Sequence, residues 1–117
     1  MPKILVTGGT GFIGSNLCAR LIADGHTVLC LDNNSTGSIA NIKQLMKNPN
    51  FEFIMHDIVN PLLISQVDQI YHLACPASPP AYQTDPIKTI QTNVIGTMNV
   101  LEFATASMAR VLFFIDL

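Results

Sequence analysis

The sequence predicts an α/β protein built on a doubly wound parallel sheet, with its strands in the order 3-2-1-4-5. Two observations carry this prediction. Short apolar runs, typical of buried strands, alternate along the chain with segments of helical periodicity. The first run is followed at once by glycines at GxxGxxG spacing, a pattern typical of a turn from a strand into a helix.

The glycine-rich turn follows a predicted strand at residues 4–6, and each glycine has a physical use. Gly8 permits a tight turn. Gly11 lets the backbone approach a pyrophosphate, whose charge is favoured by the free N–H groups at the start of the next helix. Gly14 lets that helix pack closely on the strand. The alternative is an ordinary glycine-rich turn.

The helix after this turn is predicted from four apolar residues and a glycine stop. Phe12, Ile13, Leu17 and Leu21 mark an apolar face, and Gly25 suits a left-handed residue after the C-terminal cap. A second strand at residues 27–31 follows.

Asp32 ends this second strand, 18 residues after Gly14. An acid at about this distance accepts hydrogen bonds from the adenosine ribose of a dinucleotide and repels a 2′-phosphate. The alternative is a plain turn acid before Asn33. Together with the glycines, Asp32 predicts an NAD site.

Length and composition bound the class of protein. A chain of 117 residues is long enough for one domain with a sizeable core, and 49% hydrophobic with 12% charged residues argues against disorder. A net charge of −2 without a Lys/Arg cluster gives no support for nucleic acid as a partner. No apolar run has the length of a membrane span.

The N-terminus and the cysteines predict a cytoplasmic protein. Lys3 leads straight into the first strand, which does not match a signal peptide. Cys18, Cys30 and Cys75 have no metal-type spacing, so we predict no metal site. Cys18 and Cys30 fit apolar faces and are expected to be reduced core residues.

The middle of the chain is predicted to complete the adenosine end of the site. Residues 38–46 read as a short helix and residues 51–56 as a third strand. Asp57 and Ile58 then stand where a doubly wound sheet places the adenine, so Asp57 can bond its amino group and Ile58 can pack on its ring. A surface turn acid is the alternative for Asp57.

The fourth strand, residues 69–74, should approach the nicotinamide with its small last residue, Ala74. His72 reads as a core histidine with satisfied hydrogen bonds. The loop at 75–80 is stiffened by prolines and can wall a substrate pocket.

A long helix is predicted next, with Asp85 as N-cap and Pro86 at its first position. Gly96 near its middle suggests close packing. A fifth strand follows at residues 110–115. The apolar stripe of the helix, expected to face the core, consists of Ile87, Ile90, Val94, Met98 and Leu101.

Three motifs, at residues 7–14, 72–74 and 93–97, resemble those of the extended short-chain dehydrogenase/reductases, the NAD-dependent epimerase/dehydratase family. The segments at 75–82 and 85–89 look closer still to the UDP-glucuronate decarboxylases, which make UDP-xylose. The resemblance runs from Lys3 to about Phe114 and implies a single, incomplete NAD-binding Rossmann domain over residues 1–117.

The resemblance also implies residue roles. The pyrophosphate contacts are Gly8, Gly11, Phe12 and Ile13, and the ribose contacts are Asp32, Asn33, Asn34, Thr36 and Gly37. Asp57 and Ile58 hold the adenine, while Leu73, Ala74, Cys75 and Thr92 line the path to the nicotinamide. Tyr82 and Asn99 face the UDP-sugar, and Gln91 stands where many relatives have lysine.

The family's reaction uses NAD to oxidise the sugar C4 hydroxyl; carbon dioxide is then lost and the ketone re-reduced. A Ser/Thr and a Tyr-x-x-x-Lys pair carry the proton transfers, and these 117 residues contain no such pair. The resemblance therefore favours the N-terminal portion of such an enzyme, inactive alone. The alternatives are a non-catalytic dinucleotide-binding or interaction module, or part of a related sugar epimerase or dehydratase.

The predicted fifth strand also suggests a homodimer. Residues 111–115 combine high β-propensity with no charge and no proline, at the outer edge of the predicted sheet. Unpaired backbone groups at such an edge are a template for another chain. We expect a symmetric dimer through this strand.

Overall fold

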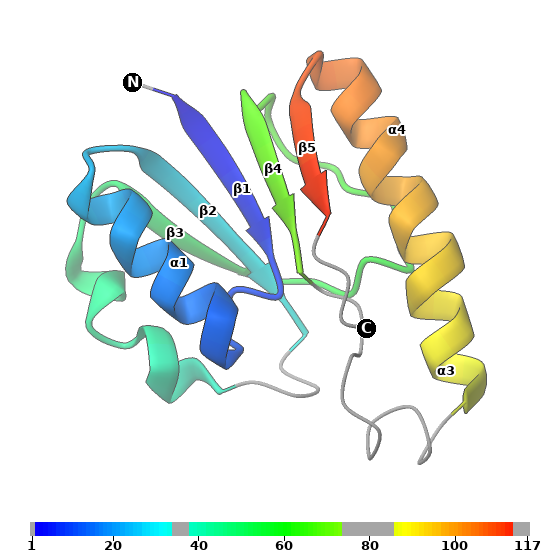
Figure 1. Cartoon of the computed structure of the whole chain (residues 1–117), viewed down its shortest axis with the longest axis horizontal. Coiled ribbons are helices and arrows are strands. Elements are labelled where there is room, and N and C mark those ends of the chain that lie inside the picture. The colour runs from blue at the N-terminus through cyan, green and yellow to red at the C-terminus, as the bar shows by residue number, and fades with distance from the viewer. Residues whose placement is uncertain (1, 34–37, 74–85, 114–117) are drawn as a thin grey trace.

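The computed structural model describes residues 2–33, 38–73 and 86–113, and it shows a five-stranded parallel sheet flanked by helices (Figure 1). The strands lie in the order β3-β2-β1-β4-β5, which confirms the predicted fold. They are β1 (Lys3–Thr7), β2 (Thr27–Asp32), β3 (Phe51–Met55), β4 (Gln69–His72) and β5 (Arg110–Phe113). The helical elements are α1 (Phe12–Ala23), η1 (Ile39–Ile42), η2 (Leu45–Lys47), α3 (Pro86–Gln91), η3 (Thr92–Gly96) and α4 (Thr97–Ser107).

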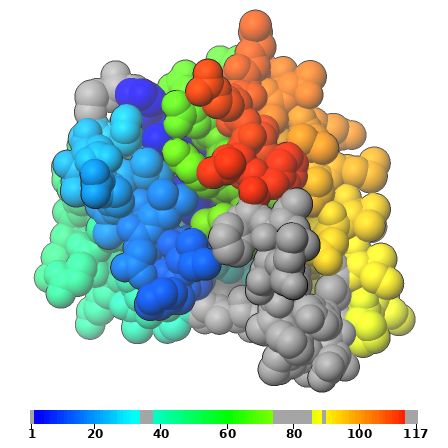
Figure 2. Space-filling model, in the orientation of Figure 1, coloured from blue at the N-terminus to red at the C-terminus, as the bar shows by residue number. Residues whose placement is uncertain are grey.

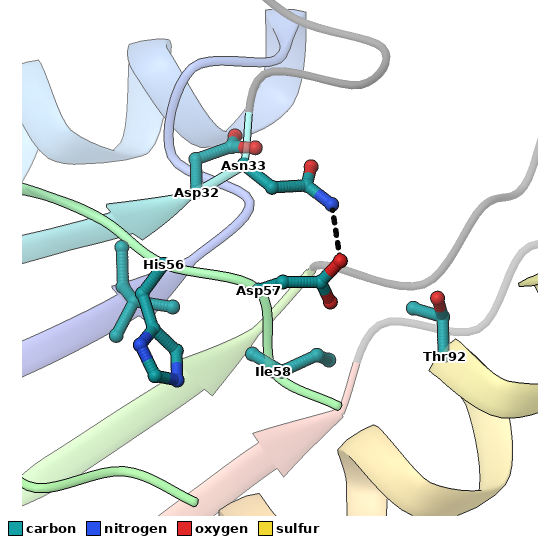
Figure 3. A pocket seen from close by; sticks show the side chains of 7 residues that line it. Asp32, Asn33, His56, Asp57, Ile58 and Thr92 are labelled. Carbon is teal, nitrogen blue, oxygen red and sulfur yellow. Dashed lines mark hydrogen bonds between the residues drawn. The ribbon is translucent and has the colours of Figure 1, made fainter. Parts of the chain in front are cut away.

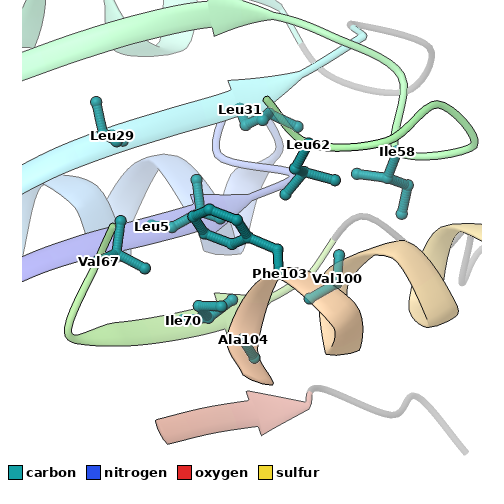
Figure 4. Packing of buried hydrophobic residues seen from close by; sticks show 10 residues of the cluster. All are labelled: Leu5, Leu29, Leu31, Ile58, Leu62, Val67, Ile70, Val100, Phe103 and Ala104. Carbon is teal, nitrogen blue, oxygen red and sulfur yellow. The ribbon is translucent and has the colours of Figure 1, made fainter. Parts of the chain in front are cut away.

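The sheet is covered on both faces, so its central strand, β1, is buried from Ile4 to Thr7. Ile4 and Val6 of β1 pack toward α1, while Leu5 points to the opposite face and packs with α4. This explains why β1 reads as a continuous apolar run rather than an alternating one. The cluster under α4, shown in Figure 4, contains Leu5, Leu29, Leu31, Ile58, Leu62, Val67, Ile70, Val100, Phe103 and Ala104.

Two of the glycines that the structure describes have a positive φ: Gly8, predicted to permit a tight turn, and Gly25, predicted to be left-handed at the end of α1. Gly8 has a φ of 76°, and its N–H donates to the carbonyl of Leu31 at 2.8 Å. Gly25, just after the C-terminal cap of α1, has a φ of 90°. Both turns therefore depend on glycine, because a Cβ atom is strained at these angles.

The predicted apolar face of α1 is wrong at its start. Phe12 and Ile13 are 82% and 49% exposed, and the buried positions of the first turns are Gly14 and Ser15, followed by Cys18 and Leu21. The reason is the close approach of α1 to the glycine-rich turn, which leaves space for small side chains only on that face.

The predicted short helix at residues 38–46 is confirmed only in part, because two separate 3-10 helices, η1 and η2, lie there instead of one continuous helix. The Ser38 N–H and the Asn41 side-chain amide both donate to the carbonyl of Thr10, and Ile42 is fully buried. These long-range anchors set the path of a segment too short to keep a helix of its own.

Among the described residues the long helix runs from Pro86 through α3, the π-helical segment η3 and α4. The predicted N-cap, Asp85, lies outside the described residues. The predicted core face of the helix is wrong. The predicted stripe is 42–69% exposed, and it consists of Ile87, Ile90, Val94, Met98 and Leu101. The face that packs inward instead carries Thr92, Gly96, Val100, Phe103 and Ala104. Spacing alone could not separate the two, because both stripes recur every three or four residues.

Candidate dinucleotide site

The carboxyl ends of β1, β2 and β3 bring the predicted site residues together. One pocket is lined by Leu31, Asp32, Asn33, His56, Asp57, Ile58 and Thr92 (Figure 3). The ends of parallel strands are where ligands bind in doubly wound sheets. The sequence anticipated five of these seven residues, from three separate elements.

The glycines of the turn serve different purposes. A Cβ atom on Gly14 would lie 2.2 Å from the carbonyl oxygen of Gly8, so α1 can approach the turn only with glycine there. This confirms the close packing predicted for Gly14. A Cβ atom on Gly11 would meet only Gly8 O, at 3.6 Å, so space is open beside it. Gly11 is the N-cap of α1 and, having no side chain, it makes no capping hydrogen bond of its own.

Gly9 was missed from the sequence. A Cβ atom there would lie 2.3 Å from the Cys30 sulfur and 3.2 Å from the Cys18 sulfur. A hydrogen bond with Cys18, together with burial, raises the pKa of the Cys30 thiol. Both cysteines are free and buried, as predicted, and a protonated buried thiol is unreactive. The pair therefore fills the space under the glycine-rich turn.

Asp32 is 8% exposed and is held by Thr10. The Thr10 N–H and hydroxyl both donate to Asp32 Oδ2, at 2.9 Å and 2.5 Å. The turn after β1 and the end of β2 are thus fixed to each other. Thr10 was not anticipated, since threonine inside a glycine motif carries no distinctive signal.

Asp57 lies at the other side of the pocket, and three groups bind its carboxylate. The Asn33 side-chain amide donates to it at 3.2 Å (Figure 3). The Val59 N–H donates to it at 3.2 Å, and Lys88 of α3 forms an ion pair with it. Burial alone raises the pKa of Asp57, but these hydrogen bonds outweigh burial and leave the pKa below its usual value. Asp57 is therefore a carboxylate at neutral pH.

Ile58 is clamped by the long helix. A Cβ atom on Gly96 would lie 2.5 Å from Ile58 Cδ1, which confirms the close packing predicted for that glycine. The Asn99 amide donates to the carbonyl of Ile58 at 2.8 Å. Thr92, at the start of the π-helical segment, is buried against the same pocket. π-Helical segments are frequent at functional sites because they shift side chains out of the regular helical register.

His72 is a core histidine, as predicted. It is 1% exposed, with Nδ1 2.7 Å from the Thr7 hydroxyl and Nε2 3.2 Å from the Thr97 hydroxyl. The Leu73 N–H donates to the Thr7 hydroxyl oxygen at 3.0 Å, so the Thr7 hydroxyl contacts both the ring and the backbone that follows β4. Burial lowers the pKa of His72 to about 4, so the ring is neutral.

The remaining predicted residues stand as follows. Phe12 and Ile13 lie exposed in the first turn of α1, and Leu73 follows β4 with its N–H bonded to Thr7 O at 3.0 Å. Six lie outside the described residues: Asn34, Thr36, Gly37, Ala74, Cys75 and Tyr82. Among the helices that the structure describes, none has the length and apolar character needed to cross a membrane.

The strand order and the glycine-rich turn define an α/β protein of the Rossmann class. The family model described as GDP-mannose 4,6 dehydratase matches residues 5–115. The chain therefore belongs to this epimerase/dehydratase family.

Individual relatives agree with this family. UDP-glucuronic acid decarboxylase 2 of Arabidopsis thaliana is 54% identical over 94% of this chain, which spans about a quarter (24%) of that protein's length. Pal from Bacillus thuringiensis superimposes with a TM-score of 0.87 at 35% identity, over 95% of this chain and 38% of Pal. UDP-glucose 4-epimerase of Thermus thermophilus, in complex with NAD, gives 0.73 at 28% identity, over 92% of this chain and 35% of the epimerase.

Proposed function

We propose that this chain is the NAD-binding portion of an enzyme that modifies a nucleotide sugar, with UDP-glucuronate decarboxylation as the reaction of the whole protein. The observation that carries the proposal is the buried Asp32 carboxylate, fixed by the glycine-rich turn that leads into a helix whose N-cap is glycine. The 54% identity to a UDP-glucuronic acid decarboxylase supports the choice of reaction. A related sugar 4-epimerase is the alternative, supported by the solved structures that resemble this chain.

The described residues fit an NAD molecule. The open space beside Gly11 and the N–H groups at the start of α1 suit the pyrophosphate. Asp32 would accept from the adenosine ribose and Asp57 from the adenine amino group, with Ile58 beside the ring. When bound, NAD would take up a hydride from the sugar.

The proposed sugar contacts come from elsewhere on the chain. Asn99 is proposed to face the UDP-sugar, together with Tyr82, which lies outside the described residues. The Tyr-x-x-x-Lys pair that moves protons in the family is not among these 117 residues. Turnover is therefore proposed for the whole protein and binding for this chain.

Cofactor choice is the first test. Asp32 repels a 2′-phosphate, and no Lys or Arg lies between residues 33 and 40 to neutralise one. We expect calorimetric titration to give NAD an affinity at least about tenfold higher than NADP, a difference of about 1.4 kcal/mol. The Asp32→Asn variant should have a smaller ratio of NAD affinity to NADP affinity. Equal or tighter binding of NADP by the wild type would contradict NAD as the cofactor.

Self-association is proposed for the 117-residue chain through the outer edge of β5. Among the described strands none pairs with that edge, and Leu112 is 57% exposed. Figure 2 shows the atoms of β5, in red, at the surface. Burying apolar area is favourable by about 25 cal/mol per Å², which should exceed the weak repulsion between two chains of charge −2.

Sedimentation velocity at tens of micromolar tests this contact. We expect a dimeric wild type and a monomeric Leu112→Lys variant, because a lysine on an edge strand opposes strand pairing. Met98→Lys is the matched control, since Met98 is as exposed, at 56%, but lies on α4. A monomeric wild type would rule out self-association. If Met98→Lys is monomeric and Leu112→Lys is dimeric, the contact lies on α4 and not on β5.

A further inference from the structure

Thr10 joins three parts of the candidate site. Its side chain is fully buried, and its N–H and hydroxyl both donate to Asp32 Oδ2, at 2.9 Å and 2.5 Å. Its carbonyl accepts from the Ser38 N–H at 3.1 Å and from the Asn41 amide at 2.7 Å. One residue therefore ties the glycine-rich turn to the end of β2 and to the segment that begins at Ser38.

The two donors fix the direction of the Asp32 carboxylate. A carboxylate bonded at one oxygen by one group can still rotate, but here a backbone N–H and a hydroxyl from the same buried residue converge on Oδ2. Hydrogen bonds to a charged acceptor are shorter and about twice as strong as neutral ones. Both donors converge on Oδ2, so Thr10 fixes the position of that oxygen.

We infer that Thr10 is a positioning residue that aims Asp32 at the adenosine 2′-hydroxyl of NAD, and that it thereby sets the preference for NAD over NADP. This inference rests on the proposed NAD site. Without the Thr10 hydroxyl the carboxylate can turn, so the loss should fall on the 2′-hydroxyl contact and spare the rest of the dinucleotide. A purely structural role would weaken every dinucleotide alike.

Three ligands and two variants separate these cases. The ligands are NAD, its analogue with a 2′-deoxyadenosine, and NADP, each titrated by calorimetry. Thr10→Val removes the hydroxyl at nearly constant shape, and Thr10→Ser keeps it.

We expect the wild type to bind NAD at least about tenfold tighter than the deoxy analogue, as one hydrogen bond to a charged group predicts. Thr10→Val should lose most of that difference, bind the analogue as the wild type does and discriminate less against NADP. Thr10→Ser should restore the wild-type pattern.

Several results would overturn the inference. One is a Thr10→Val variant that loses affinity for NAD and for the deoxy analogue equally, and another is a variant that binds NAD as the wild type does. A wild type that binds NAD but does not distinguish it from the analogue also overturns it. A wild type without NAD affinity overturns the proposed function as well. If circular dichroism shows Thr10→Val unfolded, Thr10→Ala replaces it, since it removes the hydroxyl without placing a methyl in its position.

Discussion

Replacing Gly14 by alanine should destabilise the chain by about 3 kcal/mol, the upper end of the usual cost of overpacking, and abolish measurable NAD binding. The added Cβ atom would lie 2.2 Å from Gly8 O and 2.8 Å from Gly9 Cα. Both are backbone atoms, so α1 or the turn must move as a whole. Either movement displaces the helix N-terminus from the turn that is proposed to hold the pyrophosphate. Thermal unfolding and calorimetry with NAD measure the two effects.

Gly11→Ala is the matched control, with the opposite combination of effects. Gly11 has a φ of −73° and a ψ of 176°, which alanine adopts freely, and its Cβ atom would meet only Gly8 O at 3.6 Å. The variant should keep or slightly raise stability, by up to about 1 kcal/mol, since alanine restricts the unfolded chain. Its methyl would nonetheless stand where the pyrophosphate is proposed to approach. NAD affinity should therefore fall at least about tenfold, or about 1.4 kcal/mol.

Each of these two variants has a result that would contradict the role proposed for its glycine. A Gly14→Ala variant with wild-type stability would show that α1 does not need this close approach. A Gly11→Ala variant with wild-type NAD affinity would show that the pyrophosphate does not bind beside this turn, whatever the result for Gly14→Ala.

The sheet and the turn could be predicted from the sequence because local physics determines them. Buried parallel strands are apolar throughout, and Gly8 and Gly25 stand where a left-handed backbone is needed. Asp32 and Asp57 were found because strand ends meet at one edge of a parallel sheet, so their spacing along the chain translates into proximity.

The failures have one cause, which is that periodicity does not tell which side of a helix the rest of the molecule covers. The long helix carries two comparable stripes, and the one containing Gly96 and Val100 packs inward because Ile58 fits only against a glycine. Likewise Thr10 and Gly9 gain their importance from Asp32 and Cys30, which are about twenty residues away along the chain. Such partners become visible only when the strands are side by side.

Stability should fall as the pH drops from about 6.5 to about 4, chiefly because of His72. Its pKa is lowered from 6.5 to about 4 by burial, so the folded state favours the neutral ring and the unfolded state takes up the proton first. The stabilising contribution is complete above pH 6.5 and is lost as the pH falls toward 4. A shift of this size corresponds to about 3 kcal/mol. Asp57, with its pKa lowered from 3.8, contributes to acid sensitivity only at still lower pH.

Urea unfolding at several pH values measures this loss, and His72→Gln identifies its source. Glutamine does not titrate and can still bond the Thr7 and Thr97 hydroxyls that flank the ring. The variant should be less stable at neutral pH, since it also loses the edge-to-face contact with Phe113, at 5.4 Å between ring centroids, but its stability should change little down to pH 4.5. If His72→Gln proves too unstable to study, NMR titration of the wild-type imidazole replaces it, and an ordinary pKa near 6.5 for His72 would contradict the prediction.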